Sequence, residues 1–91
     1  MKFAWDRRKA KANYAKHGVS FDFAKAVFRD SFAIEFLDDR RDYGEERFVT
    51  IGRVSEYVLY VAYTETQDVI RIISARRATA REREAYLEEN S

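Results

Sequence analysis

The chain has 91 residues, a length that suits one domain with one core, and we expect residues 1–91 to form it. Of these residues 46% are hydrophobic and 15% aromatic, which is enough apolar surface for a folded protein. There is no cysteine and one histidine, so disulfides and thiolate metal sites are excluded, and we expect no metal and no cofactor. The longest apolar run, Tyr57 to Tyr63, is too short to span a bilayer, and the amino terminus lacks an export signal. We therefore expect a cytoplasmic protein with no membrane contact.

Charge is unevenly distributed, although the formal net charge is only +1. Met1 to His17 holds six Lys and Arg residues and one acid, and Val69 to Arg81 holds four Arg residues and no acid. Between them, Asp30 to Glu46 holds seven acids and two Arg residues. If the two basic segments meet in space, they form a surface suited to a polyanion. The alternative, commoner in small domains, is that they are solvated faces that pair with the acidic segment.

The first third of the chain predicts a short strand and two helices. The strand covers Phe3 to Trp5. A helix follows, capped by Asp6, running to about His17 and stopped by Gly18. A second, short helix begins at Ser20 or Asp22 and ends near Arg29, with an aromatic stripe toward the core.

The rest of the chain predicts four strands and a last helix. The expected segments are a strand at Phe32–Leu37 buried mainly on one face, a polar loop at Asp38–Glu46, a strand at Arg47–Val54, a turn at Ser55-Glu56, a central strand at Tyr57–Thr64, a turn at Glu65–Asp68 and a strand at Val69–Ala75. Thr79 and Glu82 have the spacing of a capping box that opens the last helix. The predicted fold class is α+β: an antiparallel sheet of four to five strands with two N-terminal helices and one C-terminal helix.

Few kinds of catalysis fit these residues. No glycine-rich phosphate loop can be drawn, and a Ser-His-Asp arrangement is not visible. Asp38, Asp39 and Asp42 lack the spacing of a calcium loop and are expected to solvate a turn. Metal-free RNA cleavage requires fewer groups from the protein, because the substrate supplies its own nucleophile, the 2′-hydroxyl. The protein must then supply cations for the phosphorane and groups that move a proton.

Each candidate residue for this chemistry also has a structural interpretation. Arg71 either serves RNA or pairs with Glu35 or another carboxylate across the sheet. His17 suits the end of a helix better than catalysis, and Glu46 is a conceivable base or a loop carboxylate. Arg76 and Arg77 are adjacent and point in different directions, so at least one should reach the surface. Trp5 and Tyr14 are core or base-stacking residues, with the core favoured.

Several motifs together resemble the BrnT family of toxins. They are Phe3 to Asp6, Lys9 with Asn13, Lys16 to Phe21 (KHGVSF), Gly44 to Arg47 with Gly52, Arg71 to Ala78 (RIISARRA) and Glu82-Arg83. The resemblance covers nearly the whole chain, and the two long blocks are the most specific. It implies a RelE-like fold and a metal-independent endoribonuclease that cleaves RNA and arrests translation.

The resemblance also implies a partner and site residues. The partner would be a BrnA-like antitoxin of the ribbon-helix-helix type, joined to the toxin in a heterotetramer that binds operator DNA through the antitoxin. Carried over on the matching motifs, the site positions would be Arg47, Arg71, Arg76, Arg77 and His17. Our leading hypothesis is that Arg76 and Arg71 stabilise the phosphorane, that His17 or Glu46 moves a proton, and that the RNA backbone is bound by Arg47, Arg77, Arg81 and Lys9. The alternative is a non-catalytic module that binds an antitoxin and contributes to repression of its operon. In one departure, Thr66 stands where many relatives carry an arginine, which removes one expected phosphate contact.

Overall fold

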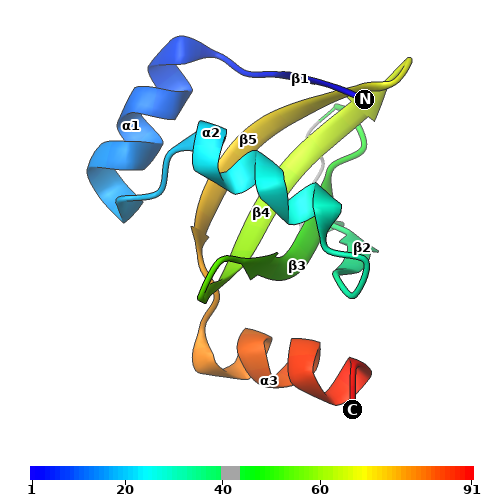
Figure 1. Cartoon of the computed structure of the whole chain (residues 1–91). Helices are drawn as coiled ribbons and strands as arrows, with labels where there is room; N and C mark the ends of the chain where they lie inside the picture. Colours follow the sequence, from blue (N-terminus) through cyan, green and yellow to red (C-terminus); the bar gives the residue numbers. More distant parts are fainter. Residues whose placement is uncertain (40–43) are drawn as a thin grey trace.

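The structure is a computed structural model that describes residues 1–39 and 44–91. Five strands form one sheet in the order β1-β5-β4-β3-β2, with α1, α2 and η1 on one side and α3 below the sheet on the other side (Figure 1). The elements are β1 (Lys2–Ala4), α1 (Arg7–His17), α2 (Phe21–Ala24), the 3₁₀ helix η1 (Lys25–Arg29), β2 (Ile34–Leu37), β3 (Phe48–Val54), β4 (Tyr57–Thr66), β5 (Val69–Arg77) and α3 (Ala80–Glu89). This arrangement confirms the predicted α+β fold class.

The first strand corrects the prediction of an antiparallel sheet. β1 pairs with β5 in parallel, with Ala4 opposite Arg71, while the other three strand pairings are antiparallel. The helices carry the chain from one edge of the sheet to the other, and the meander from β2 to β5 returns it beside β1 in the same direction (Figure 1). β1 also ends at Ala4, one residue earlier than predicted, and Asp6 two residues later caps α1. The Trp5 ring between them packs in the core, with its centroid 6.0 Å from that of Phe21.

Helix α1 begins and ends at the predicted residues. The carboxylate of Asp6 accepts hydrogen bonds from the backbone N–H groups of Arg8 (2.8 Å) and Lys9 (3.1 Å). Gly18, at φ 70°, adopts the left-handed conformation that ends the helix, and its N–H donates to the carbonyl of Tyr14 (2.8 Å). Asp6 thus orients the first turn, which carries Lys9.

Asn13 fastens α1 to the sheet, a role that the sequence did not suggest. Its side-chain nitrogen donates to the carbonyls of Val19 (3.0 Å) and Ala75 (2.8 Å), and its side-chain oxygen accepts from the N–H of Ala75 (3.1 Å). β1 covers the outer edge of β5 only as far as Arg71. Farther along that edge, the buried Asn13 amide takes the place of a neighbouring strand.

Two hydrophobic clusters lie on opposite faces of the sheet. The first joins β4 and β5 to α2 and η1, and the second lies on the face that α3 approaches. α3 begins at the predicted capping box of Thr79 and Glu82, and its Tyr86 hydroxyl donates to Asp30 (2.6 Å). The buried members of the first cluster include Phe21, Val27, Leu59, Ile70, Ile72 and Ala75, and those of the second are Val49, Ile51, Tyr60, Ala62 and Tyr86.

The strands differ from prediction in burial and length. β4 is central, as predicted, and extends to Thr66, so that Gln67 and Asp68 alone make the turn, both with positive φ. The segment predicted as a strand at 32–37 is shorter and more exposed than expected, because Phe32 lies in a turn and β2 is an edge strand. The expected loop at Asp38–Glu46 lies partly outside the described residues, and Asp42 lies outside them altogether. Within the described ranges, no helix has the length and apolar character needed to cross a membrane.

Candidate functional site

One groove brings together predicted residues from three parts of the chain. It has a volume of about 450 Å³ and lies beside the β4–β5 hairpin. Lys9 comes from the first turn of α1, Arg71 from β5 and Glu46 from the segment before β3. The other lining residues are Glu45, Phe48, Thr64, Glu65, Thr66 and Ile73. We call this cavity the Lys9–Arg71 groove.

Arg71 is available in this groove. It is exposed, and it lies opposite Thr64 in the β4–β5 pairing. Within residues 1–39 and 44–91 no ion pair is found for Arg71. Glu35, one carboxylate with which Arg71 could have paired, instead accepts a hydrogen bond from the Tyr63 hydroxyl (3.3 Å). Burial, followed by the charge of Glu35, raises the pKa of Tyr63, so this hydroxyl keeps its proton.

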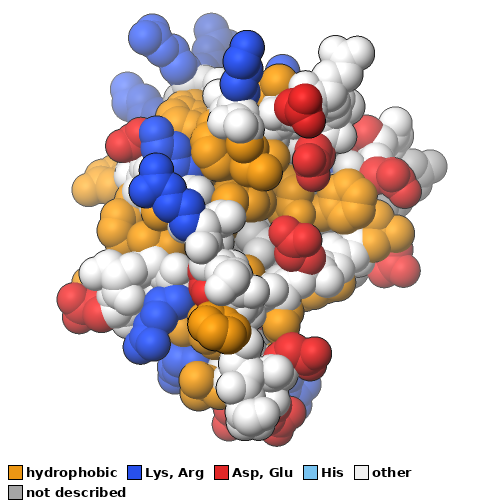
Figure 2. Space-filling view, turned by 45° about the vertical axis from the view of Figure 1, so that its right-hand side comes forward, with side chains coloured by type: hydrophobic (Ala, Val, Ile, Leu, Met, Phe, Trp, Pro, Cys, Tyr) orange, Lys and Arg blue, Asp and Glu red, His pale blue; other side chains and the backbone are white. Residues whose placement is uncertain are grey.

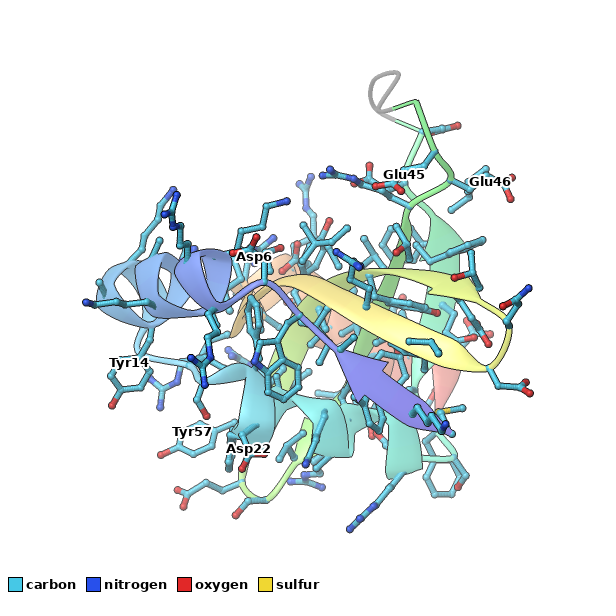
Figure 3. All side chains as sticks on the ribbon, turned by 90° about the horizontal axis from the view of Figure 1, so that it is seen from above. Asp6, Tyr14, Asp22, Glu45, Glu46 and Tyr57 are labelled. Carbon is cyan, nitrogen blue, oxygen red and sulfur yellow. The ribbon has the colours of Figure 1, made fainter. Side chains whose placement is uncertain are left out.

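Glu45 and Glu46 line the Lys9–Arg71 groove, whereas the neighbouring Arg47 does not. The Nε atom of Arg47 lies 4.0 Å from Oε1 of Glu45. The carbonyl of Arg47, just before β3, accepts a hydrogen bond from the N–H of Asp38 (2.7 Å). Figure 3 places Glu45 and Glu46 close together. In the described part of the chain, no three His, Asp or Glu side chains are arranged to hold a metal ion.

A second cavity contains two more predicted residues, His17 and Arg77. It has a volume of about 500 Å³ and lies where α1 ends, between α2 and the start of β4. Its further lining residues are Tyr14, Gly18, Val19, Ser20, Phe23, Tyr57 and Leu59. We call it the Tyr14–Tyr57 pocket. Figure 3 shows these two tyrosines near each other and far from Glu45 and Glu46, so His17 and Glu46 belong to different sites.

Arg76 lines neither cavity. Alternation along β5 turns it away from Arg77 and toward Tyr60 on the other face of the sheet. Its NH1 and NH2 groups donate to the two carboxylate oxygens of Glu82 (2.8 and 2.9 Å), and its guanidinium lies 3.9 Å from the centroid of the Tyr60 ring. The hydrogen bond from Arg76 is the main cause that holds the pKa of Glu82 below its usual value. Arg76 therefore joins β5 to the capping box of α3. Arg81 is exposed in the first turn of α3 and lines neither cavity.

Two further arginines were assigned no role from the sequence, although Arg83 belongs to one of the quoted motifs. Arg53 of β3 and Arg83 of α3 line a third cavity, which also contains Arg77. Arg53 could have been noticed because it is a charged residue within an otherwise apolar strand. Figure 2 shows the Lys and Arg side chains gathered mainly toward the left, with the acidic side chains mainly toward the right.

Tyr14 corrects another expectation. Its side chain is 58% exposed, so it does not belong to the core, whereas Trp5 packs against the first cluster as predicted. The reason is the direction of α1, which presents Asn13 and Ala10 to the sheet and leaves Tyr14 beside the Tyr14–Tyr57 pocket.

Comparison with known proteins supports the identification made from the motifs. A search of curated proteins finds no match. A family model described as "Ribonuclease toxin, BrnT, of type II toxin-antitoxin system" matches residues 5–82, a range that includes both the Lys9–Arg71 groove and the Tyr14–Tyr57 pocket. The chain therefore belongs to the BrnT family of ribonuclease toxins from type II toxin–antitoxin systems.

Proposed function

We propose that this chain is a metal-independent endoribonuclease and that the Lys9–Arg71 groove is its active site. The observation that carries the proposal is the meeting of an ammonium, a guanidinium and a carboxylate in one cavity, each from a different element. These are the groups that phosphodiester cleavage by an internal nucleophile needs. Among them, exposed Arg71 has no competing ion pair in the described residues.

The groove can perform the reaction in one displacement. The carboxylate of Glu46 takes the proton of the RNA 2′-hydroxyl, the 2′-oxygen bonds to phosphorus, and the bond from phosphorus to the 5′-oxygen breaks. Lys9 donates a proton to the departing 5′-oxygen. Arg71 binds two phosphate oxygens and stabilises the charge of the phosphorane. The products are a 2′,3′-cyclic phosphate and a 5′-hydroxyl.

Arg76 and Lys9 receive roles in this proposal that differ from the predicted ones: Lys9, predicted to bind the RNA backbone, donates a proton instead. Arg76 is already bound to Glu82 by two hydrogen bonds, so we assign it to positioning α3 and not to the phosphorane. Arg47 does not line the groove but lies beside Glu45, which does, and it keeps its predicted role of binding a neighbouring backbone phosphate. Thr66 lines the same groove, so the missing arginine of many relatives would have stood near Arg71. With three carboxylates nearby and one cation fewer, cleavage is expected to be slow.

The test is cleavage of a labelled single-stranded RNA by the purified chain in excess EDTA. We expect the native chain to cleave and to leave a cyclic phosphate. Arg71→Ala should lower the rate at least about 100-fold, and Glu46→Gln about 10²-fold to 10⁴-fold. The matched control is Arg29→Ala, which removes an exposed arginine that does not line the groove, and this variant should cleave normally. Cleavage that needs an added divalent cation, or an Arg71→Ala variant as fast as the native chain, contradicts the proposal.

Membership of a type II family implies an antitoxin partner. We infer that this partner is BrnA-like, of the ribbon-helix-helix type, that the two proteins form a heterotetramer which binds operator DNA through the antitoxin, and that free toxin arrests translation in the cytoplasm. The second candidate function, a module that binds the antitoxin without catalysis, is favoured by Thr66 and by the carboxylates of the groove. Antitoxin binding with intact RNA in the cleavage assay would support this second function.

A further inference from the structure

The Tyr14–Tyr57 pocket contains aromatic surface that neither hydrophobic core uses. Tyr14 is 58% exposed and Phe23 is 38% exposed, although both are large aromatic side chains. The rings of Phe23 and Tyr57 meet edge to face, with centroids 6.2 Å apart and an angle of 75°. The cavity of about 500 Å³ is in the size range of small-molecule sites, which run from roughly 300 to 1,000 Å³.

A guanidinium and an imidazole lie within the same pocket. The Arg77 guanidinium is 4.4 Å from the centroid of the Tyr57 ring, which orients this charge by a cation–π contact. His17, the last residue of α1, also lines the cavity. An aliphatic side chain from a protein partner could form neither a hydrogen bond nor an ion pair with these groups. A nucleotide uses both kinds, because its base stacks on aromatic rings and its phosphate binds cations.

We propose that the Tyr14–Tyr57 pocket binds one base of the RNA strand, with Tyr14 as the stacking surface and Arg77 as the contact to the adjacent phosphate. This inference rests on the proposed function, since it takes RNA to be the substrate. The pocket and the Lys9–Arg71 groove lie at opposite ends of α1. From Lys9 to His17 the helix rises roughly 12 Å, at about 1.5 Å per residue. The base bound in the pocket therefore lies a few nucleotides from the bond that is cleaved, and the pocket selects where along the strand cleavage occurs.

The experiment uses short DNA strands, which the proposed reaction cannot cleave because they lack the 2′-hydroxyl. Fluorescence anisotropy measures binding of the purified chain to a labelled thymidine hexamer and to an abasic hexamer with the same number of phosphates, at one fixed salt concentration. We expect the native chain to bind the thymidine hexamer about 10-fold more tightly, because only this strand has a base that can stack on Tyr14. Tyr14→Ala should remove this preference and leave binding of the abasic hexamer unchanged. Arg77→Ala should weaken binding of both strands.

The matched control is Phe32→Ala, which removes another exposed aromatic ring, 64% exposed and outside the pocket. It should retain the base preference, and thermal melting should show that all variants are folded. The inference is overturned if the native chain binds both strands equally or binds neither, or if Tyr14→Ala keeps the preference, as it would if the pocket instead received a side chain of a protein partner. The two proposals can fail separately. Base preference that depends on Tyr14, together with intact RNA in EDTA, refutes only the proposed function, while RNA cleavage with no base preference refutes only the pocket.

Discussion

Replacing Arg76 with alanine should cost stability, whereas replacing Arg71 should cost activity. The Arg76–Glu82 pair is partly buried, with side chains 31% and 22% exposed, and both guanidinium NH groups are used. Arg76 also stacks on Tyr60, a buried residue of β4. Arg71 is exposed, and within the described residues it has no ion pair.

The expected size of the effect follows from these contacts. A partly screened bidentate pair contributes about 1 kcal/mol, at the upper end for ion pairs near the surface. A cation–π contact on a mostly buried ring contributes about 1 kcal/mol more. A loss of about 2 kcal/mol in a domain of this size lowers the melting temperature by roughly 8–16 °C. An exposed substitution such as Arg71→Ala usually changes stability by less than about 0.5 kcal/mol, or roughly 4 °C at most.

The assay is thermal unfolding followed by circular dichroism at pH 7, with RNA cleavage measured on the same preparations well below the melting temperature. Glu82→Gln is the companion variant, since it weakens the same pair from the other side. We expect Arg76→Ala to melt early and still cleave, and Arg71→Ala to melt normally and fail to cleave. An Arg76→Ala variant that melts with the native chain but loses cleavage would refute this reasoning and would place Arg76 on the RNA.

Three more outcomes can be measured. Asn13→Ala removes three hydrogen bonds between α1, its following loop and β5 at about 1 kcal/mol each, so its melting temperature should fall by roughly 10–25 °C, while Lys11→Ala on the same helix should melt like the native chain. Burial alone would raise the pKa of Asp30, but hydrogen bonds, first that from the Tyr86 hydroxyl, hold this pKa below its usual value. The contribution of Asp30 to stability is therefore present above about pH 4 and is lost as the pH falls through the lowered pKa. In urea unfolding between pH 2 and 7, the free energy of unfolding of Asp30→Asn should fall less at acid pH than that of the native chain. Thr66→Arg adds a cation to the Lys9–Arg71 groove and should raise the cleavage rate in EDTA at least about 10-fold; a slower variant would contradict the assigned groove.

Local signals in the sequence predicted most of the fold, because local chemistry determines helix ends and strand alternation. Asp6 and Gly18 mark the ends of α1, and Thr79 with Glu82 marks the start of α3. The direction of β1 could not be predicted in this way, since its partner β5 lies at the far end of the sequence. Periodicity also shows which residues share a face without showing what covers that face, which is why the exposure of Tyr14 was missed.

The candidate site was predicted as a set of residues but not as an arrangement. One basic surface was expected only if the two basic segments meet in space, with separate solvated faces as the commoner alternative. The Lys9–Arg71 groove brings together Lys9 of the first segment and Arg71 of the second. Neighbouring residues of a strand face opposite ways, so Arg76 and Arg77 cannot serve the same cavity. The register shift opposite Ala62 and Tyr63 further changes which residues of β5 share a face with Arg71. Such a bulge has no mark in the sequence.

The parallel pairing of β1 with β5 also matters while the protein is being made. Ala4 lies opposite Arg71, so β1 leaves the ribosome before the other strands of the sheet and cannot pair until β5, the last of these strands, has been synthesised. The same closure brings the helix bearing Lys9 against β5. In an unfinished chain the two halves of the Lys9–Arg71 groove are therefore apart. The groove is complete only after β5 has been synthesised, so the ribosome that makes this toxin does not meet it earlier on the nascent chain.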